Sequence, residues 1–108
     1  MAVNWKQVST DVSLAVLDVL GNSWEVVAMA ASPQLDSMVR IGQSIEQSYN
    51  AGSLTELEYK SLRSMQRNAL KGILSSYEAI GIVVAEQAAD AAWNVISQAL
   101  LNAGVAFV

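Results

Sequence analysis

The last eighteen residues of the chain, 91–108, contain no charged side chain. Within them Asn94, Gln98 and Asn102 recur at every fourth position, which is the spacing of one line along a helix. The segment therefore predicts a helix that is apolar around most of its circumference and has one thin, uncharged polar edge. Such a surface must be covered by the rest of the chain, by other copies of the chain, or by lipid.

Charged residues are scarce over the whole chain. They make up 15% of the 108 residues, and hydrophobic residues make up 53%. An average soluble domain contains roughly 25% charged residues. The length predicts one domain, residues 1–108, with less solvated surface than most. We therefore expect contacts with copies of the chain or with other helical subunits.

The apolar periodicity predicts an all-α fold. We expect an N-terminal helical segment over 1–31, with either a kink or a turn at 21–23, and then a helical hairpin formed by 33–51 and 55–80. An apolar helix should follow over 82–103. The predicted architecture is an antiparallel helical hairpin or a small bundle of three to five helices, with a long C-terminal helical region.

Caps and breakers set these predicted boundaries. Ser32 and Pro33 predict a helix start, because Ser is a favoured N-cap and Pro fits the first helical position. Residues 50–52 end that helix with a glycine, and Ser53 with Glu56 has the spacing of a capping box. We expect no break after that, except a bend at Gly81.

The apolar face of the second half of the chain is the predicted contact surface between subunits. It comprises Leu70, Ile73, Leu74, Tyr77, Ile80, Val84, Trp93, Val95, Ile96, Leu100 and Leu101. Asn94, Gln98 and Asn102 form either the exposed edge of a mostly buried helix or a polar seam, in which amides pair between subunits and fix register. The six Trp and Tyr residues should act as packing anchors.

Two charged stripes have helical spacing. The basic stripe consists of Lys60, Arg63, Arg67 and Lys71, and the acidic stripe consists of Asp11, Asp18 and Glu25. The acidic stripe is continuous only if the first helix continues through Gly21. The basic stripe is either a solvated face, with Glu56 pairing to Lys60, or a site for an anionic partner. We expect the two stripes to meet, within the chain or between copies.

The chain lacks the usual components of catalysis. It has no His and no Cys, so the common proton shuttle, thiolate and zinc ligands are missing. The glycines are isolated, which gives no phosphate-binding loop. A net charge of −4 argues against nucleic-acid binding. We therefore expect no enzyme, no cofactor, no metal and no small-molecule substrate.

The functional prediction is a non-enzymatic structural protein that self-assembles or packs as a small helical subunit of a larger complex. The alternative is a membrane-active helical protein that inserts or forms a conduit after a trigger, which the uncharged last third and the basic stripe both suit. The chain resembles, in general style alone, small polymerising proteins of bacterial inclusions and internal virion proteins of tailed phages. No secretory signal is evident, so we expect synthesis in the cytosol.

Overall fold

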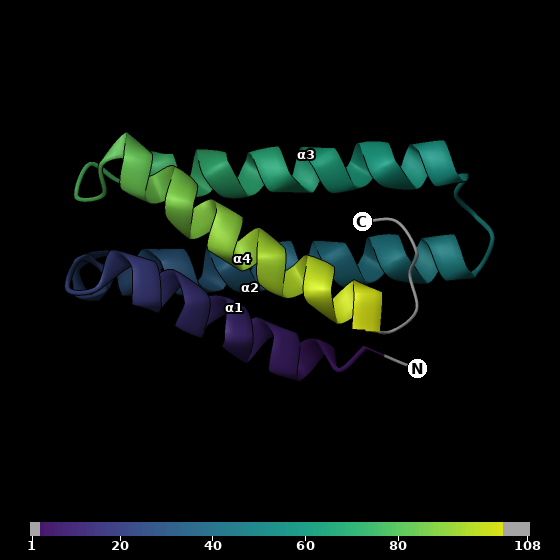
Figure 1. Ribbon diagram of the computed structural model, residues 1–108, viewed down its shortest axis with the longest axis horizontal. Coiled ribbons are helices and arrows are strands. Elements are labelled where there is room, and N and C mark those ends of the chain that lie inside the picture. The colour runs from purple at the N-terminus through teal and green to yellow at the C-terminus, as the bar shows by residue number, and fades with distance from the viewer. Residues whose placement is uncertain (1–2, 103–108) are drawn as a thin grey trace.

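Four helices in an up-down-up-down arrangement make up the described part of the chain, residues 3–102, in a computed structural model (Figure 1). They are α1 (Trp5–Leu20), α2 (Ser23–Asn50), α3 (Glu56–Ser75) and α4 (Ile82–Asn102). α1 and α3 each pack against both α2 and α4, so the helices enclose one core. The all-α prediction is confirmed, and the described residues contain no strand.

The chain turns between the first two helices rather than kinking. The N–H of Gly21 donates to the carbonyl of Leu17 at 2.8 Å, and Gly21 has a φ of 56°. That left-handed conformation suits glycine and ends a helix. α2 begins two residues later, at Ser23. The N-terminal segment is therefore two helices, and a kinked helix over 1–31 is wrong.

The predicted helix start at Ser32 and Pro33 is also wrong, because α2 continues through both residues. Val27, Ala31 and Leu35 follow one another at four-residue steps and are all buried, so tertiary packing maintains the helix. Pro33 removes the N–H that would donate to the carbonyl of Met29. Pro33 and Met29 both lie on the exposed side of α2, where water can donate a hydrogen bond to that carbonyl.

The predicted reversal after Asn50 is confirmed. Gly52 has a φ of 79°, and α3 starts after Thr55. The capping box uses Thr55 and Glu58 instead of Ser53 and Glu56. The hydroxyl of Thr55 accepts from the Glu58 N–H at 3.1 Å, and the Glu58 carboxylate accepts from the Thr55 N–H at 3.0 Å. These bonds hold the pKa of Glu58 below its ordinary value.

A second reversal lies where the sequence predicted a bend. α3 ends at Ser75, not at residue 80, and α4 begins at Ile82. The hydroxyls of Ser75 and Ser76 donate to the carbonyls of Gly72 and Ile73 in the last turn of α3, which satisfies acceptors that a continuing helix would use. The predicted helix over 82–103 is confirmed as far as Asn102, and residue 103 lies outside the described residues.

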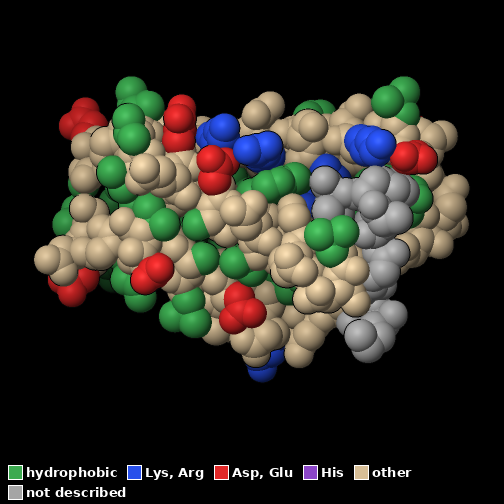
Figure 2. Space-filling model, viewed as in Figure 1, with side chains coloured by type: hydrophobic (Ala, Val, Ile, Leu, Met, Phe, Trp, Pro, Cys, Tyr) green, Lys and Arg blue, Asp and Glu red, His purple; other side chains and the backbone are tan. Residues whose placement is uncertain are grey.

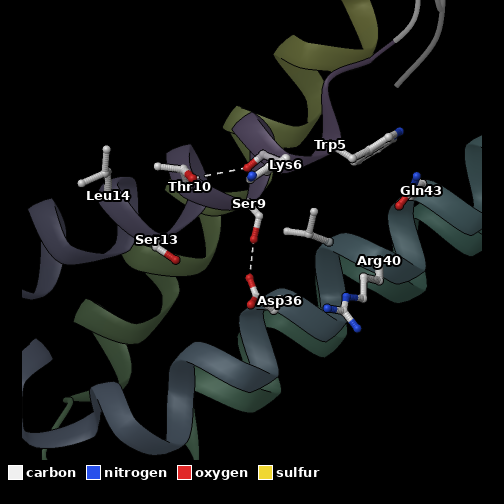
Figure 3. Close-up of a pocket in the computed structure, with 10 residues that line it drawn as sticks. Trp5, Lys6, Ser9, Thr10, Ser13, Leu14, Asp36, Arg40 and Gln43 are labelled. Atoms are coloured by element: carbon white, nitrogen blue, oxygen red, sulfur yellow. Dashed lines mark hydrogen bonds between the residues drawn. The ribbon is translucent and has the colours of Figure 1, made fainter.

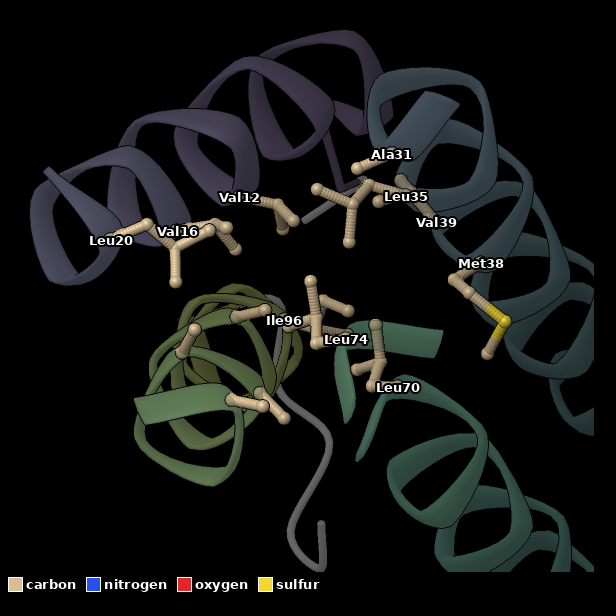
Figure 4. Packing of buried hydrophobic residues seen from close by; sticks show 14 of the residues in the cluster. Val12, Val16, Leu20, Ala31, Leu35, Met38, Val39, Leu70, Leu74 and Ile96 are labelled. Atoms are coloured by element: carbon tan, nitrogen blue, oxygen red, sulfur yellow. The ribbon is translucent and has the colours of Figure 1, made fainter. Parts of the chain in front are cut away.

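The core lies between the four helices, where buried side chains from each of them converge (Figure 4). Ala85, Ala88, Ala89 and Ala92 are fully buried. Small residues let a neighbouring helix approach closely, and α1 packs against α4 with its valines buried. The total accessible surface is 6146 Å², close to the roughly 5,800 Å² expected for a monomer of this mass. The chain therefore covers most of its apolar C-terminal helix by itself.

Matched substitutions on α3 test this core. Leu74 is fully buried, whereas Leu57 is 75% exposed. We expect Leu74→Ala to lower the free energy of unfolding by about 2–5 kcal/mol, because it leaves a cavity. Leu57→Ala should change it by less than about 0.5 kcal/mol. Urea denaturation followed by circular dichroism measures both, and equal effects would contradict the described packing.

Candidate functional site

The residues predicted to join subunits lie mostly inside this chain. Five of the eleven are buried in its core, namely Leu70, Leu74, Ile80, Ile96 and Leu100. Four more pack partly buried against the same core, namely Ile73, Tyr77, Trp93 and Val95. Val84 and Leu101 are exposed. The prediction of a contact surface between subunits is therefore wrong for most of the set. Helical periodicity shows that an apolar face must be covered. In this chain α1 packs against α4, and α2 packs against α3.

The two charged stripes do not meet within the chain. The turn at Gly21 moves Glu25 onto α2 and interrupts the acidic stripe. α1 and α3 also lie at diagonal corners of the bundle (Figure 4). Lys60 pairs with Glu56 at 3.1 Å, as predicted. Docking of the stripes inside one chain is therefore wrong.

The other members of the basic stripe have separate environments. Arg67 pairs with Asp90 of α4 at 3.2 Å, and both are about half exposed, so the pair contributes little stability. Arg63 is buried and Lys71 is half-buried. The stripe is therefore not one continuous solvated face.

The uncharged polar line of α4 lies on the surface. Asn94, Gln98 and Asn102 are all exposed. The amide of Gln98 donates to the side-chain oxygen of Asn102 at 3.1 Å. This is the arrangement of an exposed helix edge, and nothing in one chain tests a seam between subunits.

Arg63 is the centre of a buried polar cluster that joins three helices. It is 2% exposed, and its guanidinium lies over the Trp93 ring of α4, with Cζ 4.2 Å from the ring centroid. Its Nη1 donates to the side-chain oxygen of Gln66. The Gln66 amide in turn donates to the carbonyl of Met38 on α2 at 2.7 Å. The cluster thus connects α2, α3 and α4.

Burial dominates the electrostatics of this cluster. It lowers the pKa of Arg63 to about 10 and raises the pKa of Tyr59 above its ordinary value. Arg63 is charged in both the folded and the unfolded chain below pH 10, so its desolvation opposes folding there. The contact with Trp93 and the bond to Gln66 offset part of this cost. Arg63 thus joins α3 to α4 through its contact with Trp93, and to α2 through Gln66.

One end of the bundle carries exposed hydrophobic side chains. We call it the turn end, because residues 21–22 and 76–81 both lie there (Figure 1). Its exposed hydrophobic residues are Leu17, Val26, Met29, Ile82, Val83 and Val84. Met29 is 96% exposed, Val26 73% and Val83 68%. Figure 2 shows hydrophobic side chains gathered toward this end, next to acidic ones.

Acidic side chains predominate near the turn end, although Lys71, a half-buried cation, lies four residues before the end of α3. Asp18 and Glu25 flank the first turn, and Glu78 and Glu86 lie in and after the second. Neither α1 nor α3, which both finish at this end, has a basic residue in its last turn. Local periodicity does not reveal this surface, because it depends on two chain reversals, of which the first was predicted as either a kink or a turn and the second as a bend.

Two grooves share Arg40 on α2. The larger, of about 600 Å³, lies between α1 and α2 and is lined in part by Trp5, Lys6 and Arg40. In it the Ser9 hydroxyl of α1 donates to the Asp36 carboxylate of α2 (Figure 3). The smaller, of about 320 Å³, is on the outer side of α2 and α3, where Ile41, Ile45, Leu54 and Leu62 line it.

Comparison with protein-family models, with curated proteins and with solved structures finds no match to this chain. The described helices include none long and apolar enough to cross a membrane. Residues 3–102 also contain no group of three acidic side chains close enough to hold a metal ion.

Paired glycine substitutions test the buried polar cluster. A Cβ added at Gly42 would lie 2.8 Å from the Gln66 side-chain nitrogen, whereas one added at Gly72 meets nothing within 4 Å. Gly72→Ala should raise the free energy of unfolding by about 0.5–1 kcal/mol through helix propensity. The free energy of unfolding of Gly42→Ala should be about 1 kcal/mol or more below that of Gly72→Ala, because Gln66 must give up its buried hydrogen bond to the Met38 carbonyl.

The same pair in a Gln66→Ala background is the control. There the two alanine substitutions should have nearly equal effects, as measured by urea denaturation. If the free energies of unfolding of the two substitutions still differ without Gln66, the close approach of α2 and α3 at Gly42 is contradicted.

Proposed function

We propose that this protein is a non-enzymatic helical subunit that associates with copies of itself through the turn end. The observation that carries the proposal is the group of large hydrophobic side chains exposed at the starts of α2 and α4 and at Leu17. These residues remain exposed even though the chain has closed its own core. Exposed apolar side chains concentrated at one end of a folded chain are typical of an interaction surface.

The size of this surface indicates reversible association. Burying one Val, Ile or Met side chain contributes about 1.5–3 kcal/mol. Several such side chains together contribute on the order of 10 kcal/mol, from which the cost of association, an estimated 4–15 kcal/mol, must be subtracted. The net free energy fits an assembly that forms at high local concentration and dissociates on dilution.

Two substitutions on α4 test the location of the interface. Val83 lies at the turn end, and Leu101 lies near the opposite end of the same helix; both are exposed. Val83→Gln should raise the dissociation constant about tenfold, the equivalent of about 1.4 kcal/mol of lost apolar burial. Leu101→Gln should leave it within about twofold. Sedimentation equilibrium over a range of concentrations measures both.

Circular dichroism serves as the control for folding, because both side chains are exposed in one chain and neither substitution should change helicity. A molecular mass of 11.5 kDa at every concentration of the unmodified chain would overturn self-association. Association that depends on Leu101 and not on Val83 would place the interface elsewhere.

A further inference from the structure

We infer that copies associate head-to-tail, with the turn end of one copy docked on the surface around Arg40 of the next. This inference rests on the proposed self-association and adds its geometry. The Arg40 surface is defined here as the two grooves that share this residue, with Lys6, Ile41, Leu54 and Leu62 among their lining. The occupant of the Arg40 surface in this arrangement is the turn end of a second copy of this chain.

Charge opposes the simplest alternative, which is a two-fold contact between two turn ends. Such a contact would bring Asp18, Glu25, Glu78 and Glu86 of one copy close to the same carboxylates of the other. Like charges at a partly desolvated interface oppose association. The turn end has the apolar side chains for an interface, and its excess of carboxylates favours a basic partner.

The Arg40 surface supplies that basic partner together with an apolar floor. Lys6 and Arg40 are exposed and form no ion pair with another described residue. The larger groove also contains one carboxylate, Asp36, which accepts a hydrogen bond from the Ser9 hydroxyl, so its charged lining residues, Lys6, Arg40 and Asp36, leave a net positive charge. Ile41, which is half-exposed, extends the surface toward the smaller groove. Hydrophobic and acidic groups of the turn end thus meet hydrophobic and basic groups of the next copy.

The two surfaces approach each other on α1, where Leu17 of the turn end lies one helical turn from Leu14 of the larger groove, and they lie well apart on α2. Val26 and Ile41 are on the same helix, and fifteen residues at 1.5 Å each separate them by roughly 22 Å. The smaller groove of the Arg40 surface lies toward the loop between α2 and α3, which is at the end of the bundle opposite the two turns (Figure 1). Contact between two different surfaces is heterologous and continues from copy to copy, as a ring or an open filament.

A mixing experiment tests the geometry. The end variant carries Val26→Gln and Val83→Gln, and the groove variant carries Arg40→Glu; all three positions are exposed. We expect each variant alone to have a dissociation constant at least tenfold higher than the unmodified chain. An equal mixture should form a 1:1 complex of twice the chain mass and stop there, because one intact turn end meets one intact Arg40 surface.

The matched control is Lys60→Glu, a charge reversal at an exposed cation on α3 that already pairs with Glu56. It should leave association within about twofold of the unmodified chain. Light scattering coupled to size exclusion measures the mass of every sample. Rising salt should also weaken head-to-tail association, because it screens the attraction between the two surfaces.

The outcomes separate the two proposals. If the unmodified chain is monomeric, self-association itself is wrong. If it associates, but Arg40→Glu behaves like the unmodified chain and mixing yields no 1:1 complex, head-to-tail geometry is overturned while self-association stands. Association that strengthens with salt would likewise overturn it and favour contact between two turn ends.

Discussion

The contact between α4 and α1 is the interaction on which the rest of the structure depends. The C-terminal helix has no charged residue after Asp90, so its apolar face needs a cover. α1 supplies part of that cover by packing against α4. The fully buried alanines of α4 and the buried valines of α1 lie in the same core. The two-residue turn at 21–22 leaves α1 and α2 antiparallel, so α2 can pack against both α1 and α3.

Closing the core within one chain determines where apolar surface remains. The small residues of α4 are buried inside the molecule, whereas Ile82 and Val83 at its start are exposed at the turn end. Acidic residues flank this patch, and two cations without ion pairs among the described residues lie on the Arg40 surface. The result is a molecule with two chemically different surfaces on one short bundle. That asymmetry underlies the proposed association.

The sequence predicts the helices well and the burial of individual residues poorly. The reversal at Gly52 and the helix over 82–102 follow from local signals, because caps and periodicity act over one or two turns. Pro33 looked like a helix start, yet α2 passes through it, because packing of Val27, Ala31 and Leu35 outweighs one lost hydrogen bond. Arg63 looked like part of a solvated stripe. Its burial depends on Trp93, thirty residues away in the sequence, which no local pattern reveals.

Hydrogen exchange measured at low and at high protein concentration tests the central claim most directly, namely that the chain covers its own C-terminal helix. The amides of residues 88–100 should be equally protected at both concentrations, because α1 and α3 bury that helix in a single chain. Changes with concentration should be confined to the turn end and the Arg40 surface. Loss of protection across residues 88–100 on dilution would show that other copies, not this chain, cover α4, and would contradict the account.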